Sequence, residues 1–386
     1  MTSALGQIRI LDFSRVLAGP LATMVLADLG AELNKVERPG TGDDTRQWKP
    51  PVDNRGRATY FESVNRNKRS VALDLRNADD IDFARGLAAE ADVLVENFRP
   101  GVMDRLGLGY EELKAGNESL IYTSITGFGS GAGAGLPGYD LLVQAAGGLM
   151  SITGEADGEP QKVGVALVDV IAGLFSAIGI LAAIQRREVS GVGQKVEVDL
   201  LSSLLAGLVN QASAFTVGGK VPGRMGNAHP SIAPYELYPC LDGELVLAVG
   251  TDAQFRSLCE VLPDGDVLAE DRRFLTNAVR VENRQELKVE LTARLAGRKA
   301  VDWVAALSER SVPAGLVNDL AGAFAFASSL GIEPTVELAD EDGNPVSLTR
   351  NPINLSESPA TYRTAPPKLP ESPPRHGAPK DRPTWT

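Results

Sequence analysis

The first third of the chain alternates short aliphatic runs with stretches of helical periodicity, and this alternation constrains the fold more than any other feature. Hydrophobic periodicity predicts strands at 8–13, 32–36, 70–75, 92–98 and 120–125. It predicts helices at 20–29, ending before Gly30, and at 79–91. Strands that alternate with helices are typical of βαβ units, so the sequence predicts an α/β fold with an open parallel sheet.

The carboxyl ends of such strands usually surround the ligand. We therefore expect the loops after Phe13, Val36, Phe98 and Ile125 to form the walls of a site. A glycine-rich stretch follows at 127–138, and its last six residues match G-x-G-x-x-G. No strand leads directly into this match, and Pro137 stands where a dinucleotide-binding helix would begin. The stretch is therefore interpreted as a flexible loop beside the site.

The second half of the chain predicts another compact region. After residue 200, a helical stretch at 201–215 and a turn-rich connection at 217–234 come first. From Tyr235 onwards the pattern predicts a strand at 244–249 and helices at 254–261, 284–295 and 300–308. Past Gly315 the chain is linker-like, with one strand at 335–338 and a proline-rich tail from Pro352.

Composition excludes several classes of protein. The formal charge of −12 over 386 residues argues against a nucleic-acid partner, which would demand a basic surface. No segment reaches the uncharged length needed to cross a bilayer, and residues 1–6 lack the features of a signal peptide. We therefore expect a cytoplasmic protein without a membrane partner. Cys240 and Cys259 are too few for a disulfide framework.

Histidine is nearly absent, which limits the available chemistry. His229 and His376 are the only two histidines, which argues strongly against a Ser-His hydrolase, a zinc protease or a His-based metal centre, and no metal is expected. There is no phosphate loop of the Gly-x-x-x-x-Gly-Lys-Ser/Thr type. What remains is acid, base or nucleophilic work by a carboxylate.

Asp169 is the candidate for that work, because it is the only ionisable residue between Lys162 and Arg186. A carboxylate in an apolar stretch is costly unless it is hydrogen-bonded, paired or used in chemistry. Helical periodicity follows it, so Asp169 would fall at or next to an N-cap, which is a sufficient structural role for an aspartate. Both interpretations stay open, since free N–H groups at a helix start also keep a carboxylate ionised and fixed.

Basic residues gather in the first 105 positions near predicted strand ends and loops. They are Arg38, Arg46, Arg66, Lys68, Arg69, Arg99 and Arg105. In an acidic protein such residues could bind a small phosphorylated ligand. The alternative is that they are solvated surface charges.

Several longer motifs resemble the class III CoA-transferases, the CaiB/BaiF group that includes formyl-CoA transferase and the α-methylacyl-CoA racemases. The most specific are 11–46, 65–70, 96–107 and the aspartate at 169. The resemblance continues through 139–140, 147–150, 191–196 and 226–230 to about residue 367, so it covers nearly the whole chain.

The resemblance implies an interlocked homodimer in which two chains are threaded through each other. It implies a large CoA-binding domain with an open Rossmann-like sheet at 1–200, completed by 340–386. A smaller α+β domain at 235–315 would be inserted between linkers at 201–234 and 316–339.

The resemblance also implies a reaction. The aspartate matching Asp169 would attack an acyl-CoA thioester to form an acyl anhydride, and CoA would then form a thioester with the enzyme. An acceptor carboxylate would repeat these steps in reverse, which splits one difficult exchange into easier ones. An acyl-CoA and a carboxylic acid are thus the expected partners, with the coenzyme A thioester as substrate and no permanently bound cofactor.

Positional matches imply which residues hold CoA. Arg38 and Arg105 match arginines at the adenine and phosphate end. Matches to segments along the CoA cleft and near the thioester are Leu73, Asp74, Leu75, Asn97, Phe98, Arg99, Val16, Leu17, Ala18, Tyr139 and Asp140. Phe98 could instead belong to the core, and Asn97 could cap a turn.

Departures from the family patterns separate its branches. The racemases use a histidine where this chain has Tyr139, and a phenol is too weak a base at neutral pH, which favours a transferase. Formyl-CoA transferase has glutamine where this chain has Leu17 and glycines near 249–254, so a larger acyl group or a dicarboxylic acid such as succinate fits better. His229, Tyr235 and Glu236 could contact a substrate carboxylate or be ordinary loop residues. A 2-methylacyl-CoA racemase and a non-catalytic acyl-CoA binding protein remain the alternatives.

Overall fold

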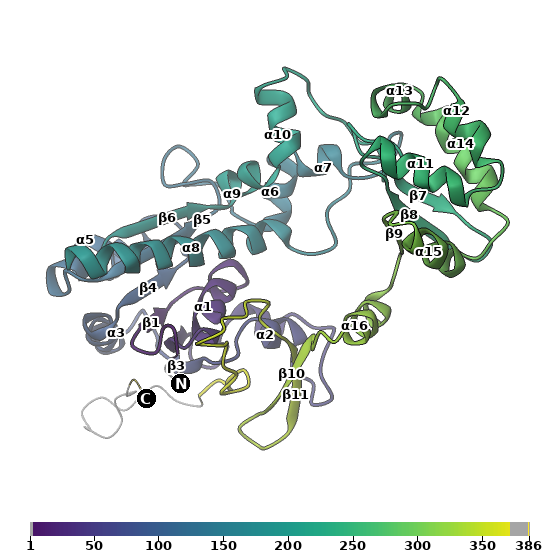
Figure 1. The fold of residues 1–386 in the computed structure, drawn as a ribbon. Coiled ribbons are helices and arrows are strands. Elements are labelled where there is room, and N and C mark those ends of the chain that lie inside the picture. Colours follow the sequence, from purple (N-terminus) through teal and green to yellow (C-terminus); the bar gives the residue numbers. More distant parts are fainter. Residues whose placement is uncertain (1–2, 371–384, 386) are drawn as a thin grey trace. The chain divides into compact units, whose positions relative to one another are not determined.

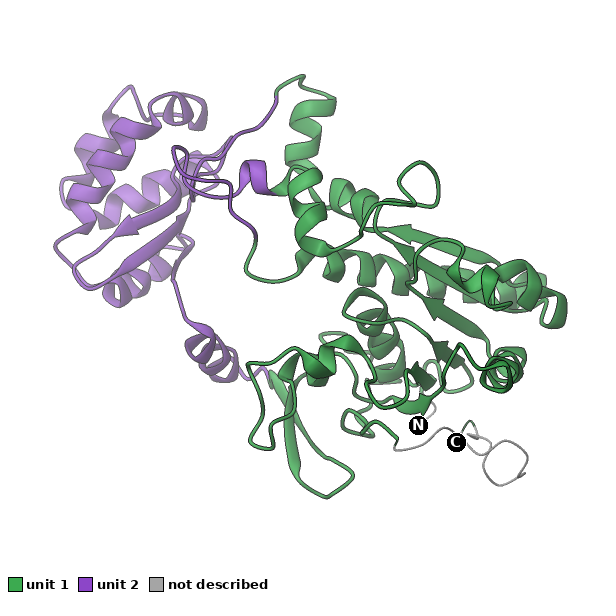
Figure 2. Cartoon of the chain, turned by 180° about the vertical axis from the view of Figure 1, so that it is seen from behind, with its two compact units in different colours: residues 1–149, 163–220, 333–386 green, residues 150–162, 221–332 purple. Residues whose placement is uncertain are grey.

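The computed structural model describes residues 3–370 and 385, and the chain divides into two compact units (Figure 2). Unit 1 comprises Met1–Leu149, Val163–Lys220 and Glu333–Thr386, and unit 2 comprises Met150–Lys162 and Val221–Ile332. Residues 371–384 and 386 of the tail, including His376, lie outside the described residues.

Unit 1 is built on a parallel sheet of six strands (Figure 1). The strands are β1 (Arg9–Asp12), β2 (Glu32–Glu37), β3 (Arg69–Ala72), β4 (Val93–Glu96), β5 (Ile121–Thr126) and β6 (Lys195–Asp199). Their order is β3-β2-β1-β4-β5-β6, and every neighbouring pair is parallel. The predicted α/β fold with an open parallel sheet is therefore confirmed.

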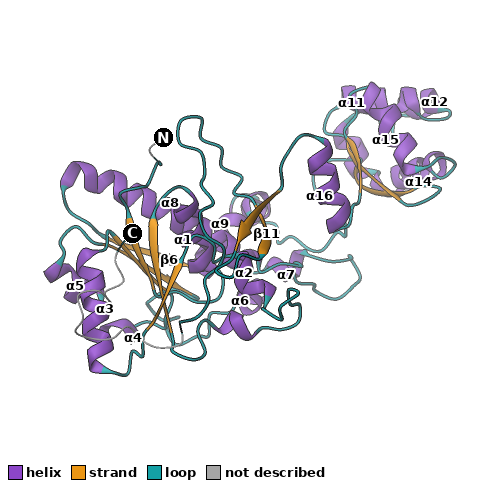
Figure 3. Ribbon diagram, turned by 90° about the horizontal axis from the view of Figure 1, so that it is seen from below, coloured by secondary structure: helices purple, strands orange, loops and turns teal. Residues whose placement is uncertain are grey.

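Helices cover both faces of this sheet (Figure 3). On one face, α1 (Ala18–Asp28) packs along α8 (Leu167–Ser190), and α8 also contacts β5 and β6. On the other face, α3 (Ala78–Glu90) and α5 (Tyr110–Gly116) enclose a core that includes Leu11, Leu87 and Leu94. Side chains alternate between the two faces of a strand, so β1 sends Leu11 to the α3 core and Asp12 to the α1 side.

Shorter elements complete unit 1. They are η1 (Asp44–Gln47), α2 (Thr59–Ser63), α4 (Val102–Arg105), α6 (Asp140–Ala146), α7 (Leu149–Ile152, which crosses into unit 2), α9 (Leu200–Gly207), α10 (Val209–Thr216), and the antiparallel hairpin β10 (Thr335–Ala339) and β11 (Pro345–Thr349). The helix predicted at 201–215 is two helices, because Val209 has a φ of 40° and interrupts the regular backbone.

The described part of the tail lies along α1. Arg363 donates hydrogen bonds to the carbonyl oxygens of Ala27, Gly30 and Ala31 at the end of that helix. The guanidinium therefore bridges carbonyls at and just after the end of α1, and this fixes the extended tail there.

Unit 2 is a small α+β unit. Its antiparallel sheet has the order β7 (Tyr235–Pro239), β8 (Glu244–Ala248) and β9 (Ala314–Leu316). Its helices are α11 (Asp252–Val261), α12 (Gly265–Glu270), α13 (Asn277–Glu282), α14 (Arg284–Leu295), α15 (Ala300–Glu309) and α16 (Leu320–Ser329). The segment 150–162 is held here because Arg224 donates to the carbonyls of Glu155 and Gly158. Helix α16 lies in the stretch interpreted as linker-like, where Asp319 caps an alanine-rich run.

In contrast to the expectation from the sequence, helix α8 is long and apolar enough to cross a membrane, judged by length and composition only, because a single aspartate in its first turn leaves the rest of the helix apolar. Within the described chain it is the one helix of this kind, and the core helices of soluble proteins meet the same criterion.

Candidate active site

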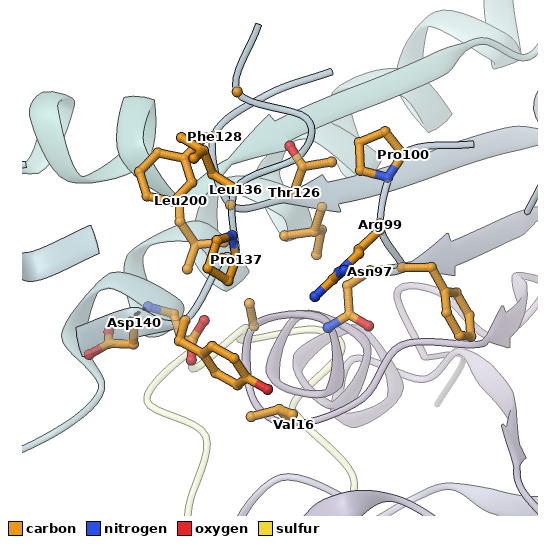
Figure 4. Close-up of a pocket in the computed structure, with 18 of the residues that line it drawn as sticks. Val16, Asn97, Arg99, Pro100, Thr126, Phe128, Leu136, Pro137, Asp140 and Leu200 are labelled. Carbon is orange, nitrogen blue, oxygen red and sulfur yellow. Dashed lines mark hydrogen bonds between the residues drawn. The ribbon is translucent and has the colours of Figure 1, made fainter. Parts of the chain in front are cut away.

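A cavity lies where the order of the sheet reverses, between β1 and β4. The loops after these two strands run to opposite sides, which leaves a crevice at their carboxyl ends. Residues of the loops after β1, β4 and β5 line this first cavity together with Asp169, Asp140 and Leu200. Figure 4 shows Asn97 and Arg99 on one side of it and Pro137, Asp140 and Leu200 on the other.

Asp169 is the third residue of α8, two residues after the helix begins. The N-cap position is Ala166, which makes no side-chain hydrogen bond, so the interpretation of Asp169 as the N-cap is wrong. Asp140, which lies on α6, caps α8 instead, because its Oδ1 accepts the N–H groups of Val168 at 2.8 Å and Asp169 at 3.2 Å. The Asp169 carboxylate is thus free of the capping work that the sequence allowed for it.

Asp140 is itself fixed by Gln144. The Gln144 Nε2 donates to Asp140 Oδ2 at 2.6 Å, and its Oε1 accepts from the backbone N–H of Val163 at 3.0 Å. This amide therefore ties α6 to the segment that leads into α8 and sets the position of Asp169.

Asp169 is half-buried, and burial together with the charge of Asp140 raises the pKa of its carboxyl to about 7. Desolvation disfavours the ionised form, and a like charge disfavours it further. An acid of this kind changes charge near neutral pH. A perturbed carboxyl in a cavity is the usual mark of a group used in chemistry.

Tyr60, which the sequence reasoning missed, packs with Val16, Leu17 and Ala166 beside this carboxyl. Burial and the charges of Asp169, Asp140 and Asp43 raise the pKa of its phenol to about 12. The hydroxyl therefore keeps its proton and remains a hydrogen-bond donor at neutral pH.

The loop after β1 is held by side chains from β1 and β2 and from the residue that follows β4. The Ser14 N–H donates to Asp12, and the Ser14 carbonyl accepts from Lys35 Nζ at 2.7 Å. Asn97 pairs with both backbone groups of Arg15, accepting at 2.9 Å and donating at 2.7 Å. Asn97 therefore positions this loop in addition to lining the cavity.

Val16, the next residue, has a φ of 70°. A β-branched residue in the left-handed region is strained by about 1 to 3 kcal/mol and persists only where its surroundings impose the conformation. Its N–H lies 3.3 Å from both carboxylate oxygens of Asp43. After Val16, Leu17 and Ala18 line the cavity, and their backbone N–H groups have no acceptor within the described chain.

Buried ion pairs lie beneath this loop. Lys35 and Asp43 are 3.0 Å apart, and Lys68 and Asp12 are 3.2 Å apart, all with side chains that are fully buried. Burial opposes ionisation of Asp43, yet Lys35 and the hydrogen bonds from Thr45 hold the pKa of its carboxyl below the ordinary value.

These ion pairs show which of the basic residues clustered in the first 105 positions are available to a ligand. Lys68 pairs with Asp12, Arg66 with Asp28 at 2.6 Å, and Arg46 with Glu37 at 2.7 Å. Both proposed roles, ligand binding and solvated surface charge, are therefore wrong for Arg66 and Lys68, and Arg46 serves mainly to pair Glu37. Arg38, Arg69, Arg99 and Arg105 are exposed.

Two glycines let α1 approach its neighbours. A Cβ on Gly173 of α8 would lie 2.7 Å from the carbonyl oxygen of Ala18, and one on Gly19 would lie 2.2 Å from Ser14 Oγ. Side chains at these positions would push the start of α1 away. Gly173 is one helical turn after Asp169, so it fixes the distance between the nucleophile candidate and the loop containing Val16.

The glycine-rich loop closes on itself. A Cβ on Gly127 would lie 2.3 Å from the Cα of Gly138, so the two ends of the loop pass each other at a distance that only glycine permits. Phe128, Leu136 and Pro137 from this loop line the first cavity. The loop therefore lies at the site where the sequence placed it.

A second cavity opens beside the first. It is lined by Phe13, Arg15, Val36, Glu37, Arg38, Leu73, Asp74, Leu75, Arg76, Phe98 and Leu106. Arg15 and Phe98 line both cavities, and the Arg15 guanidinium stacks over the Phe98 ring at 5.0 Å. The structure thus brings together most of the residues predicted for CoA in two adjoining cavities.

One residue predicted to bind CoA lies outside both cavities. Arg105 is exposed at the end of α4 and lines neither cavity, although its neighbour Leu106 lines the second. Tyr139 lines the first cavity with 63% of its surface exposed. Arg15, Thr126 and Leu200 line the same cavity and were not predicted.

His229, Tyr235 and Glu236 belong to unit 2 and line neither cavity. The His229 ring packs against Tyr235 with centroids 5.2 Å apart and the ring planes tilted by 56°, and its Nδ1 accepts the N–H of Ser231. Glu236 is buried and pairs with Lys288 at 2.6 Å. Each has a local partner that accounts for it.

Within 3–370 and 385, no group of three or more His, Cys, Asp or Glu side chains could hold a metal ion. Both cysteines are free thiols, and Cys259 is buried. The arrangement offers one perturbed carboxylate, free backbone N–H donors and cationic side chains at an opening. Such a set suits nucleophilic attack by a carboxylate on an activated acyl group.

Comparisons with known proteins agree with this chemistry. The model of CoA-transferase family III matches residues 5–372. The chain is 42% identical over 348 residues to the succinate–glutarate CoA-transferase of Agrobacterium fabrum, covering 89% of this chain and 87% of that protein. It is 43% identical over 324 residues to the mouse succinyl-CoA:glutarate CoA-transferase, covering 84% and 74%. The crystal structure of a CaiB/BaiF family protein from Brucella suis has a TM-score of 0.85 at 43% identity, covering 96% of this chain and 97% of that chain.

Proposed function

The chain belongs to CoA-transferase family III, and we propose that it moves CoA between dicarboxylic acids with Asp169 as the temporary acyl carrier. The observation that carries the role of Asp169 is its place in the first cavity: a half-buried carboxyl, released from helix capping by Asp140, beside free backbone donors. The sequence similarity to CoA-transferases of named dicarboxylic acids supports the substrate class.

The reaction proceeds through four attacks by anions. The Asp169 carboxylate attacks the thioester carbonyl of the donor, forming an aspartyl acyl anhydride and releasing CoA thiolate. The thiolate attacks the aspartyl carbonyl, giving an aspartyl-CoA thioester and the free donor acid. The acceptor carboxylate attacks this thioester to form a second anhydride and thiolate, and the thiolate then attacks the acceptor acyl carbon to give the new acyl-CoA and free Asp169.

No step in this sequence needs a general base, because every nucleophile is already an anion. This agrees with a first cavity whose lining contains no histidine among the described residues. Each tetrahedral intermediate carries an oxyanion, and the N–H groups of Leu17 and Ala18 are the donors placed to stabilise it. Asp169 must be ionised to begin the reaction.

CoA would occupy both cavities. The second cavity offers the guanidinium of Arg38 and the apolar side chains of Leu73 and Leu75, which suit phosphates and an adenine ring. Phe98 and Arg15 line both cavities, so the pantetheine arm would pass them to bring the thioester to Asp169. The guanidinium of Arg99 has no partner within the described chain and is available to an anionic group of the substrate.

We propose a homodimer as the working form. Leu174, Phe175 and Ile178 of α8 are 46%, 42% and 60% exposed, which is unusual for large apolar side chains side by side on one helix. α16 likewise exposes Leu320 and Phe326. A second copy of the chain, rather than lipid, is the proposed cover, in keeping with the interlocked arrangement that the family resemblance implies and with a cytoplasmic protein.

The test measures CoA exchange from succinyl-CoA to glutarate and to a panel of other acids. The wild type should exchange CoA, and mass spectrometry should find a CoA adduct on the peptide that contains Asp169. Asp169→Asn should lose about 10³-fold or more in kcat, since the amide cannot act as a nucleophile. Exchange that survives this substitution would remove Asp169 from the mechanism.

The two alternatives to a transferase predict different results, one in the same assay and one in heavy water. A non-catalytic binding protein would bind acyl-CoA and exchange nothing. A racemase would exchange the α-proton of a 2-methylacyl-CoA in heavy water without any acceptor acid. Tyr139, which stands at the racemase histidine position and is largely exposed, argues against that reaction.

A further inference from the structure

Asp43 is a buried residue that lies under the active-site loop and does not line the first cavity. One of its contacts is with Val16, the residue in the left-handed conformation. Its carboxylate pairs with Lys35 at 3.0 Å, accepts both the N–H and the Oγ1 hydroxyl of Thr45, and faces the N–H of Val16 at 3.3 Å. Its own N–H donates to Glu37 Oε2 at 2.9 Å. Lys35 also donates to the Ser14 carbonyl, so the pair holds the loop at two points.

We propose that Asp43, fixed by Lys35, is a positioning residue for acyl transfer that holds Val16 in its left-handed conformation. Valine avoids a φ of 70°, so the loop would relax to another backbone path if the anchor at its N–H were lost. Leu17 and Ala18 follow directly and line the cavity with Asp169. Relaxation at Val16 would therefore move these backbone groups relative to the nucleophile.

The consequence for catalysis is specific. The nucleotide end of CoA is assigned to the second cavity, which Val16 does not line. Loss of the anchor should therefore lower kcat and leave the KM for acyl-CoA nearly unchanged. A displacement of about 1 Å at reacting groups costs on the order of 100-fold in rate. This inference rests on the proposed function, because its readout is CoA transfer by Asp169.

The test is a double-mutant cycle with Asp43→Asn and Val16→Gly. The asparagine side chain keeps an acceptor but loses the charge that Lys35 fixes, and we expect kcat to fall by about 10- to 100-fold. Glycine adopts a positive φ without strain, so in the Val16→Gly background the same Asp43→Asn change should cost less than about 3-fold. Equal fold-losses in the two backgrounds would overturn the proposal, as would unchanged kcat in Asp43→Asn.

A matched control separates positioning from general loss of a buried charge. Asp28→Asn removes the partner of Arg66 from an equally buried ion pair that lines neither active-site cavity. It should lower the melting temperature and leave kcat per folded molecule near the wild-type value. If Asp28→Asn lowered kcat as much as Asp43→Asn, the effect would be structural and the proposal wrong.

We expect the Asp43→Asn variant to fold. Lys35 keeps the charges of Asp12 and Glu37 nearby when Asp43 becomes neutral, so its ammonium is not left uncompensated. If Asp43→Asn still failed to fold, Thr45→Val would replace it in the double-mutant cycle. Thr45→Val is a milder change, because it removes only one hydrogen bond to Asp43. A wild type without CoA exchange would refute the proposed function instead, so the two failures are distinguishable.

Discussion

At the scale of single residues, the reactivity of Asp169 depends on Asp140. Asp140 does two things at once: it accepts the N–H groups at the start of α8, and its charge helps to raise the pKa of the Asp169 carboxyl. The first effect fixes the position of the proposed nucleophile, and the second keeps part of it protonated at neutral pH. Position and protonation state are therefore set by one neighbour.

This coupling predicts the pH dependence of the reaction. Because the nucleophile must be ionised, kcat/KM for acyl-CoA should rise with pH and level off above an apparent pKa of about 7. Asp140→Asn removes the negative charge but keeps an oxygen that can accept the N–H groups of α8. The rising limb should therefore move to lower pH, because the ionised form of Asp169 becomes easier to reach.

The control for this profile is Asp79→Asn, an exposed residue on α3, on the other face of the sheet. Asp79→Asn should leave the rising part of the pH profile at the wild-type pH. The measurement is initial rate of CoA transfer against pH at low acyl-CoA concentration. A limb that stays near pH 7 in Asp140→Asn would show that Asp140 does not influence the ionisation of Asp169.

The sequence singles out Asp169 as a candidate but does not reveal the side chains around it. Asp169 stands out because it is the only ionisable group in a long apolar stretch, a signal that needs no structure. The capping carboxylate of Asp140 lies 28 positions before Val168, and no local pattern reports which side chain will reach a distant helix start. Similarly, Lys68 and Arg66 resembled ligand-binding cations until the structure placed Asp12 and Asp28 against them.

At the scale of elements, the contact between α1 and α8 depends on the missing side chain of Gly173. We expect Gly173→Ala to destabilise the protein by about 1 to 3 kcal/mol, because its Cβ would enter the space of the Ala18 backbone. kcat should fall as well, since the start of α1 would move away from Asp169. Chemical denaturation and CoA-transfer rates measure the two effects.

Gly86→Ala is the matched comparison, since Gly86 is also a helical glycine, in α3, and a Cβ there meets nothing within 4 Å. Alanine is the better helix former by about 0.5 to 1 kcal/mol, so this variant should be more stable than the wild type. If both substitutions shifted stability in the same direction, the close approach at Gly173 would not be the cause.

The elements of the sheet were predictable because buried parallel strands are short apolar runs with turn signals between them. β1, β2, β4 and β5 lie where periodicity placed them. The strand order, with β3 at one edge and β1 beside β4, is set by crossovers that sequence does not reveal. α16 was missed because an alanine-rich run resembles a linker, although Asp319 before it is a helix-start signal.

At the scale of the whole molecule, the described chain leaves apolar surface without a cover. Part of this surface is the exposed face of α8, and the first turn of α8 contains Asp169. Whatever covers this face therefore also supports the active site. A helix that is apolar nearly all round is normally buried on all sides. A second copy of the chain is the proposed cover, which makes assembly and catalysis dependent on each other.

Ile178→Lys tests this dependence, because Ile178 is 60% exposed on α8 and lies far enough along the helix to avoid the first cavity. A buried lysine without a partner is costly, so the variant should dissociate to monomers or aggregate, and CoA transfer should fall with the loss of dimer. Val289→Lys on α14, where the valine is 70% exposed, should change neither property. Light scattering coupled to size-exclusion chromatography gives the mass of each species. A wild type that elutes as a fully active monomer would show that the apolar face of α8 needs no second chain.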